Sequence, residues 1–249
     1  MDIIDKVCKS RKTIKEIFKD EYNTDTIPIL SKSEIRELYE LNVDENIYSN
    51  LSGCPACCFS IPHNIIDNCN LHIIYYNFPI MGNKSVKINK GSFIKKKIIP
   101  LYESNLINQI DSIIIILNEK LTNSIREINN TINILLHENE IDMINLNKEL
   151  NDKNLNLEYK HFRNIFIFDI NTLLINLLEH DYVPNHEVVR DKKEIQIILD
   201  QHNCNDKQLP IILKNDPIAK LKLCSENDVV KITRNSRNNG EYIYYRIVK

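Results

Sequence analysis

Two cysteine-containing pairs in the first third of the chain have the spacing of zinc ligands. Cys54 and Cys57 are separated by Pro-Ala, and Cys69 and His72 are separated by Asn-Leu, which gives a CxxC…CxxH pattern. Thiolate sulfur and imidazole nitrogen are the ligands that zinc prefers, and two such pairs supply the four that a structural site needs. A zinc site is therefore the first chemistry that the sequence offers.

The strands expected around these pairs argue against a shared metal ion. Runs typical of strands at Cys57–His63 and Leu71–Phe78 flank a polar turn at Asn64–Asn70, which predicts a hairpin. Cys69 then lies at the turn, whereas Cys54 lies beyond the far end of the first strand, roughly 20 Å away at ~3.3 Å per residue. Zinc bonds its ligands at ~2.0–2.3 Å. We therefore expect no metal ion at these four side chains, with zinc as the alternative if the hairpin is absent, and packing roles for the scattered Cys8, Cys204 and Cys224.

Other ionisable clusters also favour structural roles. His180 and His186 flank Pro184 with acidic residues close by, which offers a metal or acid–base site as an alternative. In an extended segment, however, alternating side chains face opposite sides of a sheet, which favours structural use. A nuclease centre would need an acid on one strand and an acid-x-lysine on the next, but Leu71–Phe78 and Ser112–Leu117 contain no acid. The sequence also lacks a Gly-rich phosphate loop, GxSxG and HExxH, so we expect no catalytic group, no cofactor and no small-molecule substrate.

The composition is typical of a globular protein that works inside the cell. Among 249 residues, 43% are hydrophobic and 27% are charged, and the net charge of −2 gives no general affinity for nucleic acid. The seven cysteines are an odd number, and Met1–Ser10 lacks the apolar core of a signal peptide, so we expect reduced thiols. No run approaches the ~18 consecutive apolar residues of a membrane span, so we expect no membrane contact. Ile, Asn and Lys are frequent while alanine occurs only at Ala56 and Ala219, which indicates an AT-rich coding sequence.

Helices and strands alternate over the first two thirds of the chain. Apolar residues at helical spacing predict helices at Asp2–Tyr22, Lys32–Leu41, Lys90–Leu106 with a kink or restart at Pro100, and Thr122–His137. Besides the hairpin, strands are predicted at Ser112–Leu117, buried on both faces, and at Asn164–Ile170. Glu138–Glu158 is polar and acidic, which indicates an inserted, solvated excursion. The order predicts an α/β unit with a helical extension at its front.

Two of these helices carry more detailed signals. Ser31 or Ser33 should cap the second helix, with Glu34 in its first turn. The fourth helix should bury the residues at helical spacing, Ile125, Ile128, Ile132 and Leu135.

The last third of the chain predicts a small α+β unit. An Asp-x-x-Glu capping box at Asp191 opens one helix, and the Asp-Pro pair at Asp216 opens another. Val229–Arg234 and Glu241–Val248 are β-rich runs, and Asn239-Gly240 before the second is a strong turn pair, so these runs should form a hairpin.

Three sequence blocks follow one another in this unit. They are YVPNHEVV at Tyr182–Val189, QLPIILKNDPIAK at Gln208–Lys220, and DVVKITR at Asp228–Arg234 followed by GEYIYYRIV at Gly240–Val248. They resemble the signatures hxLVPxHxxL, QLPrIlksDPvAr and dvvkIiRpS…aGeYvyYRlV of one family. That family comprises the small subunit shared by eukaryotic RNA polymerases I, II and III and its shorter counterpart in the archaeal RNA polymerase.

The N-terminal part resembles the jaw domain of the eukaryotic members more loosely. SRKTI at Ser10–Ile14, the aromatic strand Tyr75–Pro79 and the strand Ser112–Leu117 fit its pattern. Leu121–Ile125 falls where the family has a loop with Pro and Ala that opens a helix, and here both are missing. Because the archaeal counterpart contains only the C-terminal module, the jaw implies a eukaryotic-type polymerase. The divergent jaw and the AT-rich composition favour a large cytoplasmic DNA virus of eukaryotes over a cellular source.

The resemblance implies a non-catalytic subunit and two sets of functional residues. In the family the C-terminal module docks on the largest polymerase subunit, and the N-terminal domain forms part of the lower jaw beside downstream DNA. The DNA-proximal residues would be Thr122, Asn123, Ser124, Arg126, Lys84 and Lys87. The residues at the subunit interface would be Pro210, Asp216, Pro217, Lys220, Arg234, Tyr245 and Arg246.

Local charge agrees with both contacts. In the C-terminal hairpin only Glu241 opposes the basic residues Lys231, Arg234, Arg237, Arg246 and Lys249, and we expect these to pair with acidic residues of the partner subunit. The lysines between Lys84 and Lys97 have no acid among them and suit sequence-independent phosphate contacts. The plainer interpretations are a solvated basic face, an ordinary helix cap at Thr122, and codon bias for the lysines.

We therefore predict a structural and DNA-guiding polymerase subunit that acts in transcription. Its partners would be the largest and other polymerase subunits and downstream duplex DNA. The fold would combine a jaw domain at 1–171, with a mixed sheet flanked by helices and an insertion at about 138–158, and a C-terminal assembly domain at 172–249. The alternatives are a free-standing regulatory protein that binds polymerase or a transcription factor through the same module, and a metal-binding or nuclease-like enzyme. A viral protein would reside in the host cytoplasm and the virion, and a cellular one in the nucleus.

Overall fold

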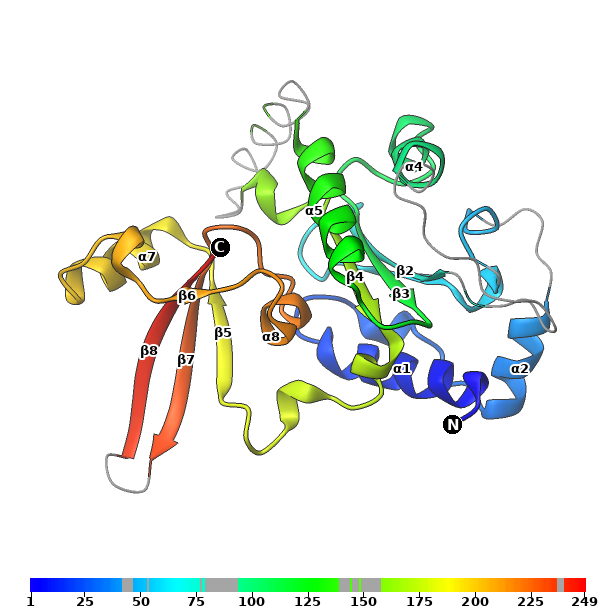
Figure 1. Cartoon of the computed structure of the whole chain (residues 1–249), viewed down its shortest axis with the longest axis horizontal. Helices are drawn as coiled ribbons and strands as arrows, with labels where there is room; N and C mark the ends of the chain where they lie inside the picture. The colour runs from blue at the N-terminus through cyan, green and yellow to red at the C-terminus, as the bar shows by residue number, and fades with distance from the viewer. Residues whose placement is uncertain are drawn as a thin grey trace. The chain divides into compact units, whose positions relative to one another are not determined.

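The computed structural model describes residues 1–41, 47–52, 54–76, 78, 94–138, 144, 148, 158–236 and 240–249. This part of the chain divides into two compact units, an N-terminal unit of residues 1–139 and 162–176 and a C-terminal unit of residues 140–161 and 177–249. Each unit has a four-stranded sheet of its own, and Figure 1 shows the order of the elements. A domain boundary between residues 171 and 172 stays a prediction.

A mixed sheet forms the centre of the N-terminal unit. Its strands are β1 (Phe59–Pro62), β2 (Asn70–Tyr76), β3 (Ser112–Leu117) and β4 (Ile165–Asp169), in the order β1-β2-β3-β4. β1 and β2 are antiparallel, as the expected hairpin requires, whereas β2, β3 and β4 are parallel. Every residue of β3 is buried, as its isoleucine run predicts for a central strand.

Helices of the same unit precede the sheet in sequence and lie between its strands. Those that the structure describes are α1 (Ile3–Ile17), α2 (Lys32–Glu40), α4 (Ile99–Glu103) and α5 (Asn123–His137). α1 packs against α2, and α5 packs against β4 (Figure 1). The predicted cap of α2 is confirmed, because the Ser31 hydroxyl accepts from the Glu34 N–H and the Glu34 carboxylate accepts from the Ser31 N–H. α4 begins anew after a π-helical turn, with Pro100 in its first turn.

Two details of the helices differ from the prediction. α1 ends at Ile17 instead of Tyr22, because Phe18 leaves the helical backbone with φ −97° and ψ 5°. In α5 the buried leucine is Leu136, which is 4% exposed, and the predicted Leu135 is 40% exposed. With 3.6 residues per turn, Leu136 returns closer to the line of buried residues than Leu135 does.

One amide side chain of α5 completes the edge of the first sheet. Asn133 Nδ2 donates to the Ile165 carbonyl oxygen at 2.9 Å, and Asn133 Oδ1 accepts from the Ile165 N–H at 2.8 Å. β4 is the last strand of its sheet, so these backbone groups point away from β3. The amide therefore gives Ile165 the partners that a further strand would give it.

The C-terminal unit has a second, separate sheet. Its strands are β5 (Asn185–Val189), β6 (Ile211–Ile212), β7 (Val229–Ser236) and β8 (Gly240–Val248), in the order β5-β7-β8-β6. β7 is antiparallel to both β5 and β8, and β6 is parallel to β8. The pairing of β7 with β8 runs from Val229 opposite Ile247 to Ser236 opposite Gly240.

Two helices of this unit begin where the sequence predicts. α7 (Lys192–Gln201) follows Asp191, whose carboxylate accepts from the Lys193 N–H at 2.8 Å. α8 (Pro217–Leu221) follows Asp216, whose carboxylate accepts from the Ile218 N–H at 2.9 Å. These carboxylates satisfy N–H groups that a helix start leaves without partners.

The two helices pack on opposite faces of the second sheet. One buried cluster joins Ala219 of α8 to Val230 and Val248, and the other joins α7 to Val229 and Ile247. Neighbouring residues of a strand point to opposite faces, so the two clusters lie on different sides of β7 and β8. We call these sides the α8 face and the α7 face.

Asp228, which is 1% exposed, joins several segments of the C-terminal unit. Its Oδ1 lies 2.9 Å from Nε2 of His161, and its Oδ2 accepts from the Ser225 N–H at 2.8 Å. Arg190 Nε lies 3.6 Å from Oδ2, and Lys160 Nζ lies 3.7 Å from Oδ1. A carboxylate buried this deeply needs such cations and donors around it.

Glu158, the last residue of the predicted insertion, takes part in this network through Lys160. Most of the stretch 138–158, which we expected to be a solvated excursion, lies outside the described residues. Its end is held, because the Glu158 carboxylate lies 2.5 Å from Nζ of Lys192 and 3.4 Å from Nζ of Lys160. The Ser225 hydroxyl also donates to the Lys160 carbonyl oxygen at 2.8 Å. The charge of Glu158 therefore has partners in the C-terminal unit, and the solvated excursion stays a prediction for the rest of the stretch.

No helix in the described ranges is long and apolar enough to cross a membrane.

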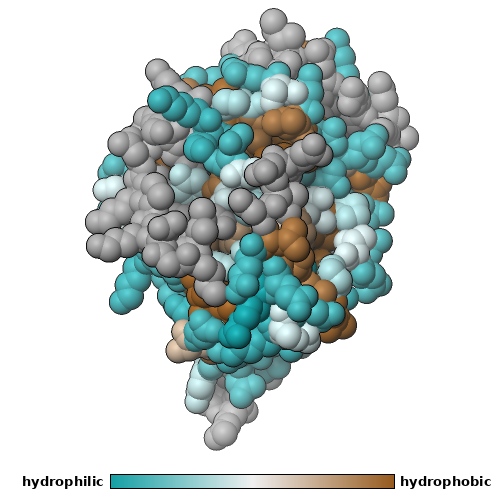
Figure 2. Space-filling view, turned by 90° about the vertical axis from the view of Figure 1, so that its right-hand side faces the viewer, coloured by the Kyte–Doolittle hydropathy of each residue, from teal (hydrophilic) through white to brown (hydrophobic). Residues whose placement is uncertain are grey.

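On the face drawn in Figure 2, hydrophobic residues are visible in separate areas between hydrophilic ones.

Asn133→Ala should lower the free energy of unfolding by about 2–4 kcal/mol, because two buried backbone groups of Ile165 lose their partners. Asn130→Ala, at an exposed position of the same helix, gains the same helix propensity and should stay within about 0.5 kcal/mol of its parent. Urea unfolding of both variants measures the difference. Equal stability of the two variants would mean that the amide does not support the sheet edge.

Asp228→Asn should lower the free energy of unfolding at pH 7 by about 3–5 kcal/mol, because His161 and Arg190 lose their anionic partner. Burial raises the pKa of Asp228, but the hydrogen bond and charge of His161, the charge of Arg190 and the Ser225 N–H lower it below its ordinary value overall. The carboxylate therefore stabilises the fold above the unfolded pKa of about 3.9, and this contribution is lost as pH falls through the lower folded pKa.

The same titration predicts how the gap between variant and parent depends on pH. The gap should be full at pH 7, should begin to narrow below about pH 4, where the unfolded carboxylate takes up its proton, and should close as pH falls through the lower folded pKa. Urea unfolding across this range measures it, with the exposed Asp206→Asn as the control. A gap that is constant down to acid pH would contradict the assigned role of the charge.

Candidate subunit-docking surface

Two arginines flank one tyrosine on the α8 face of the second sheet. The register of β7 and β8 places Arg234 opposite Tyr242 and Val230 opposite Arg246. The side chains of Arg234, Tyr242 and Arg246 therefore share the face of Tyr244. The guanidinium carbons of Arg234 and Arg246 lie 5.0 Å and 5.7 Å from the centre of the Tyr244 ring. The Tyr242 and Tyr244 rings stack with centroids 6.0 Å apart. We call Arg234, Tyr242, Tyr244 and Arg246 the Arg–Tyr cluster.

Neither arginine of the cluster forms an ion pair with a carboxylate within the described ranges. Arg246 Nη1 donates to the Ile211 carbonyl oxygen at 2.9 Å, which fixes its guanidinium, and Arg234 lies exposed over Tyr244. A planar guanidinium against an aromatic ring keeps donors free for a carboxylate. The cluster can therefore receive acidic groups from outside the chain.

The other basic residues expected on this surface lie elsewhere. Lys231 is on the α7 face, where its Nζ lies 3.0 Å from the Glu187 carboxylate. Lys249 Nζ donates to Asn227 Oδ1 at 2.5 Å, and Arg237 lies outside the described residues. The expectation of one continuous basic hairpin is therefore wrong for Lys231, because strand alternation divides these residues between two faces.

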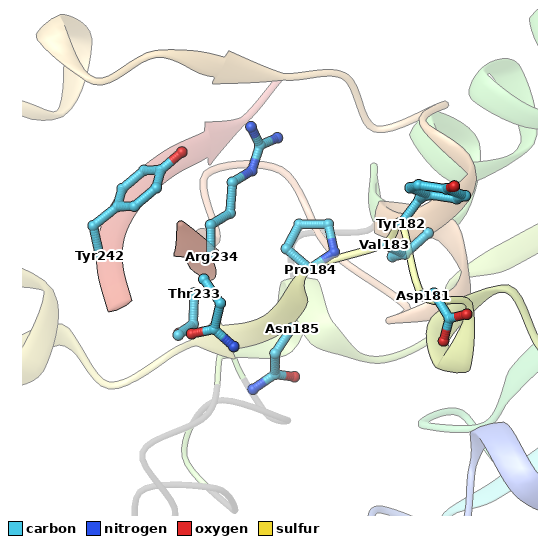
Figure 3. Close-up of a pocket in the computed structure, with 9 residues that line it drawn as sticks. Asp181, Tyr182, Val183, Pro184, Asn185, Thr233, Arg234 and Tyr242 are labelled. Atoms are coloured by element: carbon cyan, nitrogen blue, oxygen red, sulfur yellow. The ribbon is translucent and has the colours of Figure 1, made fainter. Parts of the chain in front are cut away.

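A groove of about 790 Å³ lies beside the cluster. One wall is the segment Asp181–Asn185, which leads into β5, and the other is formed by Thr233–Asn235 and Tyr242. In Figure 3 the side chains of Arg234 and Tyr242 come from the terminal hairpin, and Pro184 and Tyr182 come from the segment before β5. Tyr182 is 91% exposed, so the groove has aromatic, prolyl and cationic groups open to a partner.

The two histidines near Pro184 hold the local backbone. His186 is buried, and its Nδ1–H donates to the Pro184 carbonyl oxygen at 2.7 Å. Burial lowers the pKa of His186, although the Pro184 carbonyl and Asp216 oppose this, so the ring is neutral at pH 7. His180 Nδ1 accepts from the Tyr182 N–H at 3.3 Å. Both rings therefore shape the segment before β5, as the structural interpretation expected.

The predicted interface residues do not form one patch. Pro210 and Pro217 are exposed, and Asp216 is the partly buried cap of α8. Lys220 is 8% exposed within α8, so its side chain is not available to a partner in this structure. Tyr245 is on the α7 face, where its ring lies 5.4 Å from that of His202.

Arg234 and Arg246 are the predicted interface residues that the structure brings together. Sequence reasoning missed Tyr242 and Tyr244, which complete the cluster. The sequence pattern that could have identified them is the alternation along β8, in which Tyr242, Tyr244 and Arg246 occupy every second position and so face the same side.

The predicted DNA-proximal residues gather at the start of α5. Thr122 caps the helix, because its Oγ1 accepts from the Ile125 N–H at 3.4 Å. Asn123, Ser124 and Arg126 follow in its first turn and are exposed. Lys84 and Lys87 lie outside the described residues.

The side chains of the CxxC…CxxH pattern have other partners. His72 Nε2 lies 2.9 Å from an Asp111 oxygen, and His72 Nδ1 lies 2.8 Å from the Tyr48 hydroxyl. Cys69 donates weakly to the Ile110 carbonyl oxygen at 3.9 Å. Among the residues with a described position, no three His, Cys, Asp or Glu side chains form a group that could hold a metal ion.

Residues 175–248 match the family described as RNA polymerase Rpb5, C-terminal domain. The chain is 41% identical over 70 residues to the DNA-directed RNA polymerase subunit Rpo5 of Nitrosopumilus maritimus (strain SCM1), which covers 28% of this chain and 83% of that relative. It is 38% identical over 73 residues to the Rpo5 subunit of Methanococcoides burtonii, which covers 29% of this chain and 92% of the relative. The DNA-directed RNA polymerases I, II, and III subunit rpabc1 of Dictyostelium discoideum is 37% identical over 75 residues, 30% of this chain and 38% of the relative.

The matched residues include the whole second sheet, the Arg–Tyr cluster and the groove. The archaeal relatives are matched over most of their own length. The family resemblance read from the sequence is thereby confirmed, and the chain belongs to the Rpo5/Rpb5 family of DNA-directed RNA polymerase subunits.

Proposed function

We propose that the chain is a non-catalytic subunit of a multisubunit DNA-directed RNA polymerase and acts in transcription. Its C-terminal unit docks on the largest subunit, and its N-terminal unit forms the lower jaw near downstream duplex DNA. The observation that carries the docking role is the Arg–Tyr cluster, whose two guanidinium groups have no carboxylate partner in the described chain. The cluster lies within the part of the chain that matches the polymerase family.

The chemistry of the cluster suits a protein interface better than a free surface. Tyrosine and arginine are enriched where protein interfaces bury their centres, because both combine a large flat area with hydrogen-bonding groups. A partner that covers Tyr244 would also desolvate Arg234 and Arg246, so it must supply carboxylates for them. The expected contact is therefore an acidic segment of the largest subunit.

The groove beside the cluster extends the same surface. It adds the Pro184 ring and the Tyr182 and Tyr242 rings to the exposed guanidinium of Arg234. An apolar or aromatic side chain next to the acidic group of the partner would fit these walls. Docking would then combine apolar burial with charge complementarity, which gives affinity and specificity together.

The start of α5 supports the DNA-facing role of the N-terminal unit. Asn123, Ser124 and Arg126 are exposed beside the N-terminal end of the helix, whose N–H groups favour anions. Phosphate contacts of this kind carry no sequence information, as an enzyme that moves along any DNA requires.

The buried polar groups of the N-terminal unit support a non-catalytic role. His72 and Asp111 form a pair that resembles a catalytic couple, but their side chains are 7% and 1% exposed. The Tyr48 hydroxyl and the Asn70 and Asn108 N–H groups occupy the remaining positions around them. A substrate has no access to this pair, which stabilises the sheet instead.

A free-standing regulatory protein that binds polymerase or a transcription factor through the same module is the second candidate. The exposed Arg–Tyr cluster favours it equally, because the cluster fits any acidic partner. Stoichiometric co-purification with the two large polymerase subunits separates the two functions. For the first function we expect an intracellular protein, in the host cytoplasm and virion if viral and in the nucleus if cellular.

Arg234→Glu combined with Arg246→Glu should weaken retention of the largest subunit by at least about 30-fold, because lost buried charge pairs cost about 2–5 kcal/mol. Lys193→Glu combined with Lys207→Glu, an equal reversal of charge at exposed positions of α7 and of the turn Asp206–Gln208, is the matched control and should retain the partner. Affinity purification of the tagged chain, with quantification of co-eluting subunits, measures the effect. Stoichiometric retention by the double variant would remove the docking role of the cluster.

Arg126→Ala should reduce the contact of the assembled polymerase with downstream DNA. Loss of one phosphate contact should lower the slope of log affinity against log salt by about 0.9. Lys19→Ala, at an exposed position after α1, is the control. Photo-crosslinking from the DNA backbone should also label residues near Asn123 and Ser124, and an unchanged slope together with absent crosslinks would argue against the DNA-facing role.

A further inference from the structure

Three thiols gather in one short turn ahead of β1. Cys54 precedes a 3₁₀ turn at Pro55–Cys57, and Cys58 follows it. The Cys57 N–H donates to the Cys54 carbonyl oxygen at 3.0 Å, which closes the turn. Such a turn brings its first and fourth Cα atoms within about 7 Å, and a disulfide needs about 4.4–6.8 Å. The backbone between Cys54 and Cys57 therefore already has the span of a disulfide.

The side chains of Cys54 and Cys57 also influence each other. Each thiol shifts the pKa of the other, and both side chains are buried, at 0% and 1% exposure. Arg11 approaches from α1, and its Nη1 donates to the Cys57 carbonyl oxygen at 2.9 Å. The positive charge of Arg11 thus lies next to the pair.

These interactions shift the pKa values of the two thiols in opposite directions. The hydrogen bond from Cys54 lowers the pKa of Cys57, and the charge of Arg11 lowers it further against the opposing effect of burial. The same hydrogen bond, together with burial, raises the pKa of Cys54. Cys57 is the better thiolate, and Cys54 keeps its proton beside it.

We propose that Cys54 and Cys57 form a reversible dithiol–disulfide pair, an oxidative modification site within the N-terminal unit. The inference stands on the closed turn, which holds the two cysteines at the backbone span of a disulfide, and it is independent of the proposed polymerase docking. A hairpin strand follows the turn directly, so the site lies apart from both the Arg–Tyr cluster and the start of α5 in sequence.

We take hydrogen peroxide as the oxidant, because it is only slightly larger than water and is therefore the small oxidant best suited to a buried thiol. The Cys57 thiolate attacks one peroxide oxygen, the O–O bond breaks, and hydroxide leaves to give a sulfenic acid. The Cys54 sulfur then attacks the Cys57 sulfur, and the sulfenic hydroxyl leaves as water with the Cys54 proton. Overall two thiols and one peroxide give one disulfide and two waters, and a small dithiol reverses the change.

Cys58 has a different environment although it is the neighbouring thiol. Its sulfur accepts from the Tyr75 N–H at 3.4 Å and donates to the Cys54 carbonyl oxygen at 3.8 Å. Burial raises the pKa of Cys58 to about 12 despite the hydrogen bonds that oppose it. Cys58 therefore stays protonated and provides a matched control within the same turn.

Burial also sets the expected rate of the modification. Cys8 and Cys204 are only partly buried, so peroxide should oxidise them sooner. Neither residue has a second cysteine within several positions in the sequence. Their oxidation should therefore give sulfenic acid or mixed disulfides and no disulfide within the turn. A redox titration at equilibrium tests whether the Cys54–Cys57 disulfide forms, independently of how fast it forms.

The full-length chain is equilibrated anaerobically with graded ratios of reduced and oxidised dithiothreitol, its free thiols are alkylated, and its peptides are analysed by mass spectrometry. The expected result is a peptide in which Cys54 and Cys57 carry no alkyl group in oxidising buffer, two hydrogens lighter than the free dithiol, and in which both are alkylated in reducing buffer. Cys58→Ser should leave this transition unchanged. Cys54→Ser and Cys57→Ser should each abolish it.

Complete alkylation of Cys54 and Cys57 at every ratio, with the fold retained by circular dichroism, would overturn the proposal. A bond from Cys58 to either residue in the parent chain would overturn it as well. Because the bond is detected directly in the parent chain, the result does not depend on whether the serine variants fold. A second measurement with hydrogen peroxide should give the same bonded peptide, more slowly than the oxidation of Cys8 and Cys204.

Discussion

The alternation of side chains along β7 and β8 determines both the packing and the surface of the C-terminal unit. Val230 and Val248 face α8, while Val229 and Ile247 face α7, so both cores depend on the same two strands. Farther along the hairpin the α8 face carries Arg234 and no longer carries a core residue. A slip of one residue between the strands would exchange the faces and would bury charges while exposing valines. The two cores therefore fix the face on which the Arg–Tyr cluster stands.

The same alternation explains why the cluster has charge left for a partner. On the α7 face Lys231 pairs with Glu187, so that pair is satisfied within the chain. On the α8 face the guanidinium groups of Arg234 and Arg246 rest on the Tyr244 ring instead. In water an exposed guanidinium is well solvated, so this arrangement costs the isolated chain little. Once a partner covers it, the same group needs a carboxylate, and selectivity for an acidic partner follows.

Local signals in the sequence predicted most elements, because they depend on neighbours within a few residues. The box at Ser31, the Asp-Pro pair at Asp216 and the isoleucine run of β3 are of this kind. Contacts between distant segments were not predictable, because no pattern marks them: Asp228 with His161, or Asn133 with Ile165, depends on how the chain folds back. The sequence predicted part of the candidate site, because it identified Arg234 and Arg246. It did not predict that Lys231 lies on the opposite face, which only the register of the strands shows. Lys220 is 8% exposed, and its assignment to the interface stays a prediction, because a signature motif does not distinguish a residue that packs from one that docks.

Sequence similarity to the relatives named above covers less than a third of this chain. The archaeal relatives are matched over 83% and 92% of their own length by about 70 residues of this chain, so in them little exists beyond the C-terminal module. The N-terminal unit has its own sheet and its own buried core, and neither requires residues of the second sheet. Under the proposed division of roles, its fold is free to diverge as long as its core packs, because docking is assigned to a different surface. The residues proposed to face DNA at the start of α5 are a capping threonine and an exposed arginine, although the Pro and Ala of the family pattern are missing. A contact that reads only phosphate charge depends on the position of a few polar groups, and not on the loop sequence that precedes them.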